Sequence, residues 1–168
     1  MILTAALRGK LSNSFRITST LAEDQRAALE HLFFFNVNQH RVLPGIQRSI
    51  ESYGVPEIVQ REGRLNIQVG SLEGVQTLFA VSEFGTPLGV AVFVPLNDGR
   101  FVVLHLVVEP RLRSTTDLNT QVLLELLYEV RSAARRLGHI DRIELVYNQR
   151  HGIRLNSGEP ALRESARL

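Results

Sequence analysis

The feature that most constrains the fold is a run of apolar segments in the middle of the chain. Residues 75–110 read VQTLFAVSEFGTPLGVAVFVPLNDGRFVVLHLVVEP, in which EFGT and LNDGR separate three apolar stretches. Both separators are rich in residues that favour tight turns, so the pattern predicts an antiparallel meander. The last stretch is apolar at almost every position, which predicts burial on both faces and helices on both sides of the sheet.

The segment after this meander predicts a long helix and a further strand. Apolar residues recur there at helical spacing, and Gly138 follows them as the residue that ends the helix. The stripe consists of Leu118, Val122, Leu126, Val130, Ala133 and Leu137, broadened by Leu123, Leu127 and Ala134. The segment DRIELVY then predicts a strand that is parallel to the strand before the helix, because a helical crossover connects the two.

The N-terminal half predicts smaller elements. SFRITSTLAEDQRAALEHLFFF reads as a short strand followed by a helix, with Thr20 and Glu23 spaced as a capping box. A second helix is predicted from near Pro44 to Tyr53, with Gly54 as its stop. EIVQREGRLNIQV then predicts two short strands around a Glu-Gly turn.

Length and composition favour one globular domain. The 168 residues are 44% hydrophobic and 21% charged, and we expect a loose tail over 1–14, a single domain over 15–168 and an atypical segment over 150–168. The absence of cysteine excludes disulfides and thiolate catalysis. Nearly all basic residues are arginines, and they are scattered, which does not support nucleic-acid binding. With no membrane-spanning run or signal sequence, the prediction is a cytoplasmic protein with no membrane partner.

The element order and several motifs resemble the Gcn5-related N-acetyltransferase (GNAT) superfamily. FRITSTLAEDQRAALEHLF is similar to the family's opening strand and first helix, and VSEFGTPLGVAVF, with Gly85 and Gly89, to its second hairpin. In LHLVVEPRLR, Val108-x-Pro110-x-x-Arg113 matches the Val-x-Pro-x-x-Arg lead-in to the cofactor loop. The resemblance covers residues 15–147. It implies an α+β fold, in which a mostly antiparallel mixed sheet has one parallel strand–helix–strand unit and helices on both faces.

The resemblance also implies a function, which is acyl transfer from acetyl-CoA or another acyl-CoA to a small-molecule or peptide amine, without a metal. The backbone of Leu106, Val107 and Val108 would contact the pantetheine arm of the cofactor. The pyrophosphate would meet the loop and helix start formed by Arg113, Ser114, Thr115, Thr116 and Asp117.

Three residues are candidates for proton transfer. His105 interrupts an apolar run, so it is either a buried, hydrogen-bonded histidine or a group facing the ligand. Glu109 follows the same strand and is either a base or a solvated rim residue. Tyr147 could protonate the leaving thiolate, although it comes earlier in the chain than the family's terminal tyrosine.

The cofactor loop departs from the family pattern, which places two small residues where this chain has Thr116 and Leu118. Glycine permits close approach to a phosphate, and Asp117 adds negative charge there; Thr116 or Asp117 could simply cap the helix. A second hypothesis is therefore a GNAT-like binding or regulatory domain that has lost CoA binding and could form a homodimer. A third is recognition of a different acyl carrier, such as acyl-carrier protein.

Overall fold

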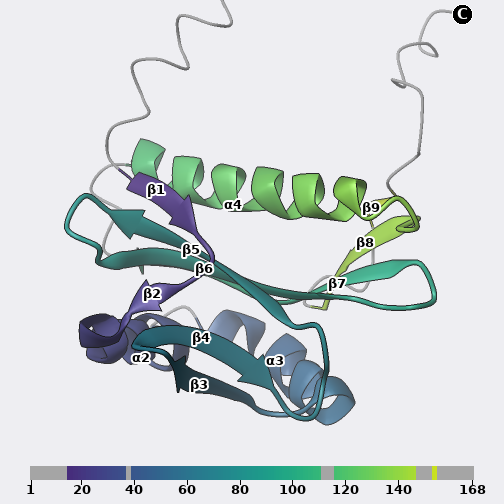
Figure 1. Ribbon diagram of the computed structural model, residues 1–168, viewed down its shortest axis with the longest axis horizontal. Coiled ribbons are helices and arrows are strands. Elements are labelled where there is room, and N and C mark those ends of the chain that lie inside the picture. The colour runs from purple at the N-terminus through teal and green to yellow at the C-terminus, as the bar shows by residue number, and fades with distance from the viewer. Residues whose placement is uncertain (1–14, 37–38, 111–115, 147–152, 155–168) are drawn as a thin grey trace, which may run out of the picture.

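The chain folds into two β-sheets, with helices on both faces of the larger one (Figure 1). This computed structural model describes residues 15–36, 39–110, 116–146 and 153–154, with the backbone alone at 39–43, 116–117, 119 and 153–154. The predicted α+β class is confirmed. Among the described helices, none is long and apolar enough to cross a lipid bilayer.

The larger sheet has six strands in the order β1-β5-β6-β7-β8-β9. Its strands are β1 (Phe15–Thr18), β5 (Gln76–Ser82), β6 (Pro87–Pro95), β7 (Arg100–Val108), β8 (Arg142–Leu145) and β9 (Ile153–Arg154). Neighbouring strands are antiparallel, except that β7 and β8 are parallel. Helix α4 (Thr116–Arg136) connects β7 to β8, so the predicted meander and the predicted parallel strand–helix–strand unit are both confirmed.

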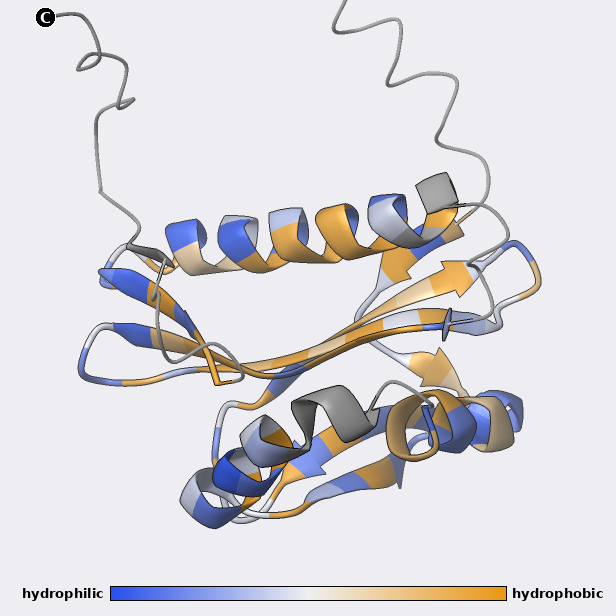
Figure 2. Cartoon of the chain, turned by 180° about the vertical axis from the view of Figure 1, so that it is seen from behind, coloured by the Kyte–Doolittle hydropathy of each residue, from blue (hydrophilic) through white to orange (hydrophobic). Residues whose placement is uncertain are grey.

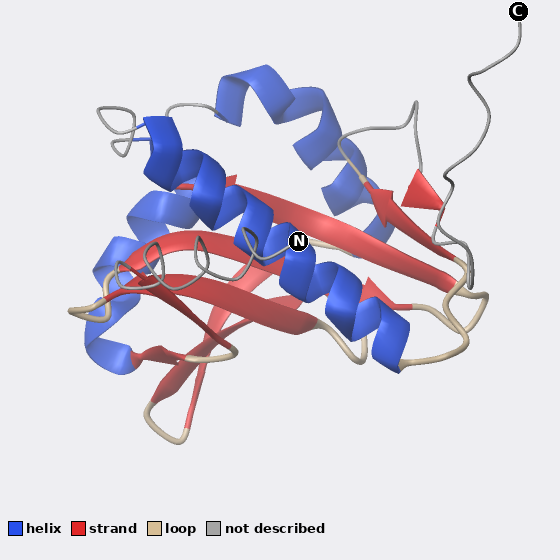
Figure 3. Cartoon of the chain, turned by 90° about the horizontal axis from the view of Figure 1, so that it is seen from above, coloured by secondary structure: helices blue, strands red, loops and turns tan. Residues whose placement is uncertain are grey.

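Helix α4 covers one face of this sheet, and the view from above shows it running across the strands (Figure 3). Its apolar side faces the sheet and its polar side faces away (Figure 2). The predicted stripe is confirmed at Val122, Leu126 and Val130, which are almost fully buried. Leu137 is 38% exposed, contrary to the prediction, because the helix ends at Arg136 before that side chain can turn inward.

Gly89 in β6 allows α4 to lie close to the sheet. A β-carbon at this position would lie 2.8 Å from Cγ1 of Val122, 3.0 Å from Cδ1 of Leu126 and 3.3 Å from the Val107 carbonyl oxygen. Carbon atoms in ordinary contact are about 3.5–4.0 Å apart. The helix therefore packs against the backbone of β6, in space that any larger residue would occupy.

The opposite face is covered by two helices and the smaller sheet. The elements are α2 (Arg26–Phe34), α3 (Gln39–Tyr53) and strands β2 (Leu21–Ala22), β3 (Pro56–Arg61) and β4 (Arg64–Val69), in the sheet order β2-β4-β3. Glu62 and Gly63, with φ of 51° and 70°, form the turn between β3 and β4, as a two-residue hairpin requires. These two strands were predicted. Their separation into a second sheet was not, because a strand pattern does not specify its partner.

The predicted capping box is wrong. Thr20 precedes β2, and a 3-10 helix, η1 (Glu23–Gln25), intervenes before α2 begins at Arg26. The N-cap residue of α2, Gln25, makes no capping hydrogen bond with its side chain, and near Thr20 the Thr18 hydroxyl donates to the Thr20 carbonyl oxygen at 3.1 Å. The turn is thus closed by a side chain that lies upstream of the predicted pair.

Helix α3 begins earlier than predicted. It starts at Gln39, so Pro44 lies inside the helix and not in its first turn. Proline removes one backbone donor, yet the helix continues through it to the predicted stop. There the Gly54 N–H donates to the Ile50 carbonyl at 2.8 Å, and Gly54 has a φ of 103°.

Two glycines meet where α3 and β4 end. A β-carbon on Gly54 would lie 2.7 Å from the α-carbon of Gly70, and one on Gly70 would lie 2.8 Å from the Tyr53 carbonyl oxygen. The Gly70 N–H also donates to the Val55 carbonyl at 3.0 Å. The two backbones therefore touch at a point that admits no side chain.

Ion pairs join the beginning of β7 to β8. Arg100 Nε lies 2.7 Å from Asp98 Oδ2, and Arg100 Nη1 lies 3.4 Å from Glu144 Oε2. Glu144 Oε1 is also 2.8 Å from Arg142 Nε. The hydrogen bond from Arg100 lowers the pKa of the Asp98 carboxyl group. The parallel pair is thus held together at the Arg100 end.

Candidate functional site

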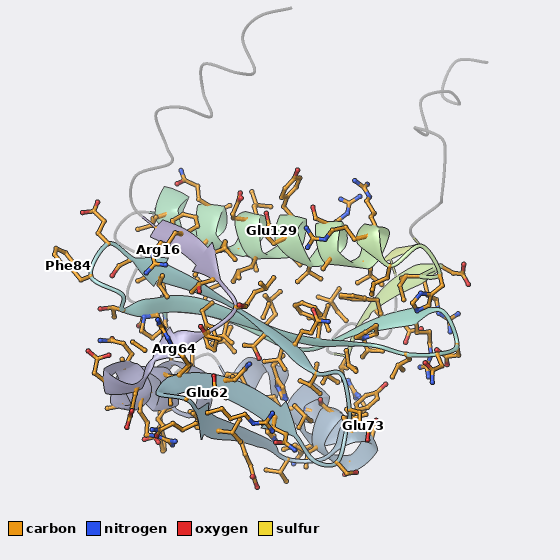
Figure 4. All side chains as sticks on the ribbon, in the orientation of Figure 1. Arg16, Glu62, Arg64, Glu73, Phe84 and Glu129 are labelled. Atoms are coloured by element: carbon orange, nitrogen blue, oxygen red, sulfur yellow. The ribbon has the colours of Figure 1, made fainter. Side chains whose placement is uncertain are left out.

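The predicted ligand-binding residues that the structure describes lie at the end of β7 (Leu106, Val107 and Val108) and at the beginning of α4 (Thr116 and Asp117). The beginning of α4 and the β5–β6 hairpin lie at the same end of the sheet (Figure 1). The tip of that hairpin carries Phe84, which is 90% exposed and points away from the protein (Figure 4). Tyr147, Arg113, Ser114 and Thr115 lie outside the described residues.

Strand β7 contains a β-bulge at Leu104. Phe93 pairs with Val103 and Val92 pairs with His105, so Leu104 has no partner on β6. Leu104 packs into the core on the α2 side, and the His105 ring packs against Phe33 of α2 with a centroid distance of 5.3 Å. The bulge therefore turns two consecutive side chains toward the same layer, as bulges beside functional sites often do.

Beyond the bulge, the backbone groups of alternate residues face opposite edges of the strand. The Glu109 N–H donates to the Leu88 carbonyl at 2.8 Å, which points it toward β6. By alternation, the backbone groups of Val107 and His105 also face β6. Those of Leu106 and Val108 face the other edge, and we call this edge of residues 104–108 the open edge of β7.

Strand β8 does not cover the open edge. Parallel pairing with β7 extends only from Arg100↔Arg142 to Val103↔Leu145, and the Val146 N–H then donates to the Val103 carbonyl at 3.2 Å. Within the described part of the chain, no strand pairs with Leu106 or Val108 on this edge. An open strand edge offers alternating donors and acceptors to an extended ligand.

Two side chains from the helical layer reach the open edge. Asn36 follows α2, and its Nδ2 donates to the Val108 carbonyl at 3.1 Å. Ser49 lies in α3, and its Oγ donates to the Leu104 carbonyl at 3.5 Å. Asn36 is 8% exposed and Ser49 is fully buried. Neither was identified from the sequence, where the only sign of Asn36 is a polar residue directly after three phenylalanines.

His105 is buried, with 4% of its surface exposed. Burial lowers the pKa of its imidazole to about 4, because the charged form loses its hydration. The side chain is therefore uncharged at neutral pH. Its burial agrees with the interpretation as a buried histidine. The uncharged imidazole lies on the α2 side of β7.

The beginning of α4 supplies a second part of the candidate site. The helix begins at Thr116, so Thr116 and Asp117 belong to its first turn. A helix N-terminus attracts anions through its exposed N–H groups and its dipole, and an aspartate there competes for the same field. Leu118, which stands where the family has a small residue, packs against the core under α4, so its bulk has a place inside the protein.

Comparison with protein-family models finds no match, and neither does comparison with curated proteins. Among solved structures, an acetyltransferase of the GNAT family from Staphylococcus aureus is 14% identical, with 79% of this chain and 73% of that chain covered and a TM-score of 0.49. Nourseothricin acetyltransferase is 18% identical, with coverages of 79% and 71% and a TM-score of 0.43. A GNAT family N-acetyltransferase from Escherichia coli, in complex with CoA, is 12% identical, with coverages of 81% and 64% and a TM-score of 0.43.

The fold of this chain is GNAT-like by its own topology. The antiparallel strands β1, β5, β6 and β7 are followed by α4 and the parallel strand β8, and helices cover both faces of the sheet. This arrangement is the one that the sequence resemblance implies. It identifies the class of fold, which by itself does not determine an activity.

Proposed function

We propose that the protein transfers an acyl group from an acyl-CoA, such as acetyl-CoA, to an amine acceptor. The observation that carries this proposal is the open edge of β7, produced by the bulge at Leu104 and by the early end of pairing with β8. This edge can hold the amide-containing pantetheine arm as an additional strand. The N-terminus of α4 lies at the same end of the sheet and suits the pyrophosphate (Figure 1).

In this proposal, Leu106 and Val108 contact the pantetheine arm through their backbone groups, whereas the backbone of Val107 is engaged with β6. Arg113 and the segment from Ser114 to Asp117 bind the pyrophosphate, with the arginine compensating for the negative charge of Asp117. The CoA thioester supplies the activated acyl group. The protein positions it and excludes water from it.

The acceptor nitrogen attacks the thioester carbonyl carbon, forming a C–N bond as the C–S bond breaks. Backbone N–H groups on the open edge stabilise the negative charge that develops on the carbonyl oxygen. Glu109, at the end of the strand, takes up the proton that the amine loses. Tyr147 returns a proton to the departing CoA thiolate.

Calorimetric titration with acetyl-CoA, together with thermal denaturation, tests the proposal. Ligand at about 100 times its dissociation constant should stabilise the protein by roughly 2.7 kcal/mol. Arg113→Ala should weaken binding about tenfold, whereas Arg131→Ala, on the exposed side of α4, is the matched control and should not. No heat and no stabilisation at millimolar acetyl-CoA would overturn the proposal.

One observation favours a second candidate function, a binding or regulatory domain without CoA. Asp117 lies in the first turn of α4, where a carboxylate opposes a phosphate. That candidate predicts no stabilisation by acetyl-CoA and a dimer in analytical ultracentrifugation. Release of the CoA thiol in the presence of a panel of amines would exclude it.

A further inference from the structure

Some backbone groups on the open edge of β7 already have hydrogen-bond partners within the protein, and others do not. Of the three carbonyl groups on this edge, those of Leu104 and Val108 already accept hydrogen bonds from Ser49 and Asn36. Leu106 lies between them. Within the described residues, both its N–H and its carbonyl lack a partner on this edge, as does the N–H of Val108.

A ligand would not easily displace the Asn36 amide from the Val108 carbonyl. Asn36 is only 8% exposed, so displacement of its amide would leave a polar group with little access to water. An incoming N–H group therefore competes poorly for the Val108 carbonyl. Among the described residues of the open edge, Leu106 then offers a ligand both a donor, its N–H, and an acceptor, its carbonyl.

We propose that Asn36 is a positioning residue that fixes the register of the ligand on β7. Pantetheine contains two amide groups. The N–H and the carbonyl of one trans amide point in opposite directions, so each amide offers only one group to this edge. With Asn36 on the Val108 carbonyl, the N–H of one amide donates to the Leu106 carbonyl, and the carbonyl of the other amide accepts from the N–H of Leu106. The thioester is thereby held at a single distance along the strand. The inference rests on the proposed function, because pantetheine is the arm of CoA.

Two variants separate this role from simple packing. Asn36→Asp keeps the shape of the side chain but replaces the donating amide with an acceptor, and Asn36→Ala removes both. Asn66→Ala is the matched control, because Asn66 Oδ1 accepts from the Ile67 N–H at 2.9 Å in the separate sheet. Acetyl-CoA affinity is measured by calorimetry at a temperature at which circular dichroism shows each variant to be folded. Amide exchange at Leu106 is measured by NMR with and without acetyl-CoA.

We expect affinity to fall about fivefold or more in both Asn36 variants, because they lose the hydrogen bond that fixes the Val108 carbonyl beside the ligand. Affinity should change less than about twofold in Asn66→Ala. Acetyl-CoA should slow exchange at the Leu106 amide in the wild type and not in Asn36→Asp. Wild-type binding with unchanged affinity and unchanged Leu106 protection in the Asn36 variants overturns the positioning role and leaves the proposed function standing. Absence of wild-type binding overturns both. If the Asn36 variants do not fold, the wild-type exchange decides, and no slowing at Leu106 overturns the inference.

Discussion

Replacing Gly89 with alanine tests how closely α4 packs on the sheet. The new methyl carbon would lie 2.8 Å from Val122 Cγ1 and 3.0 Å from Leu126 Cδ1, both on side chains with no exposed surface. It would also lie 3.3 Å from the Val107 carbonyl oxygen, which belongs to a strand in the middle of the sheet. The helix or its side chains must therefore shift outward.

Two opposing effects determine how much Gly89→Ala changes the free energy of unfolding. Overpacking a buried site costs about 1–3 kcal/mol, and replacing glycine by alanine returns about 0.4–1 kcal/mol by restricting the unfolded chain. Gly89 does not have a positive φ, so alanine fits the backbone and only the contacts oppose it. We expect a net loss of about 1–2 kcal/mol, which corresponds to a melting temperature lower by roughly 2–8 °C.

The assay is urea denaturation followed by circular dichroism, for Gly89→Ala, Val122→Ala and the double variant. Because Val122→Ala removes the nearest methyl group, Gly89→Ala should cost about 1 kcal/mol less in that background. Full stability of Gly89→Ala, or strictly additive losses in the double variant, would refute the close packing of α4 on β6.

Three further predictions concern stability. His105 binds a proton below about pH 6.5 in the unfolded chain, but only below about pH 4 in the folded chain. As the pH is lowered from 6.5 to 4, the free energy of unfolding should therefore fall by on the order of 3 kcal/mol. Urea titrations should show a much smaller fall in His105→Leu, and an equal fall would contradict the assignment. Gly54→Ala should cost about 1–3 kcal/mol more than Gly85→Ala in thermal denaturation, because both positions have positive φ but only Gly54 contacts Gly70; equal losses would count against that contact. Glu144→Gln should lose less than about 1 kcal/mol and less still at high salt, because its ion pairs are partly exposed, and a loss above about 2 kcal/mol in urea denaturation would show that they are stronger than their exposure implies.

The elements that were predicted correctly are determined by residues close to one another in the sequence. Gly63, Gly85 and Gly99 all have positive φ, and each marks a tight turn between strands that alternation or apolar runs also indicate. Helix α4 combines an apolar stripe with Gly138 at its end, so its sequence determines both its face and its length. The crossover through α4 then requires β8 to be parallel to β7.

The features that were not predicted depend on contacts between distant segments. The segment RFVVLHLVV is apolar on both faces, so it shows no alternation of polar and apolar residues. A one-residue bulge at Leu104 therefore causes no visible change in the sequence pattern. The hydrogen bonds of Asn36 and Ser49 depend on where α2 and α3 pack. The sequence also does not show that Val107 turns its backbone toward β6 while its neighbours face the open edge, because that orientation follows from the bulge.

The contact between Gly54 and Gly70 has a consequence for the order in which the chain folds. Only the β3–β4 hairpin separates these two glycines, so α3 and the hairpin close on each other across a short loop. Pairing of β7 with β8 must instead enclose the whole of α4, and such non-local pairs form slowly. We expect α3 and the hairpin to assemble first and the parallel pair last. Until β8 pairs, the same edge of β7 is open at residues 100–103 as well, so the length of the open edge is set only in a nearly finished protein.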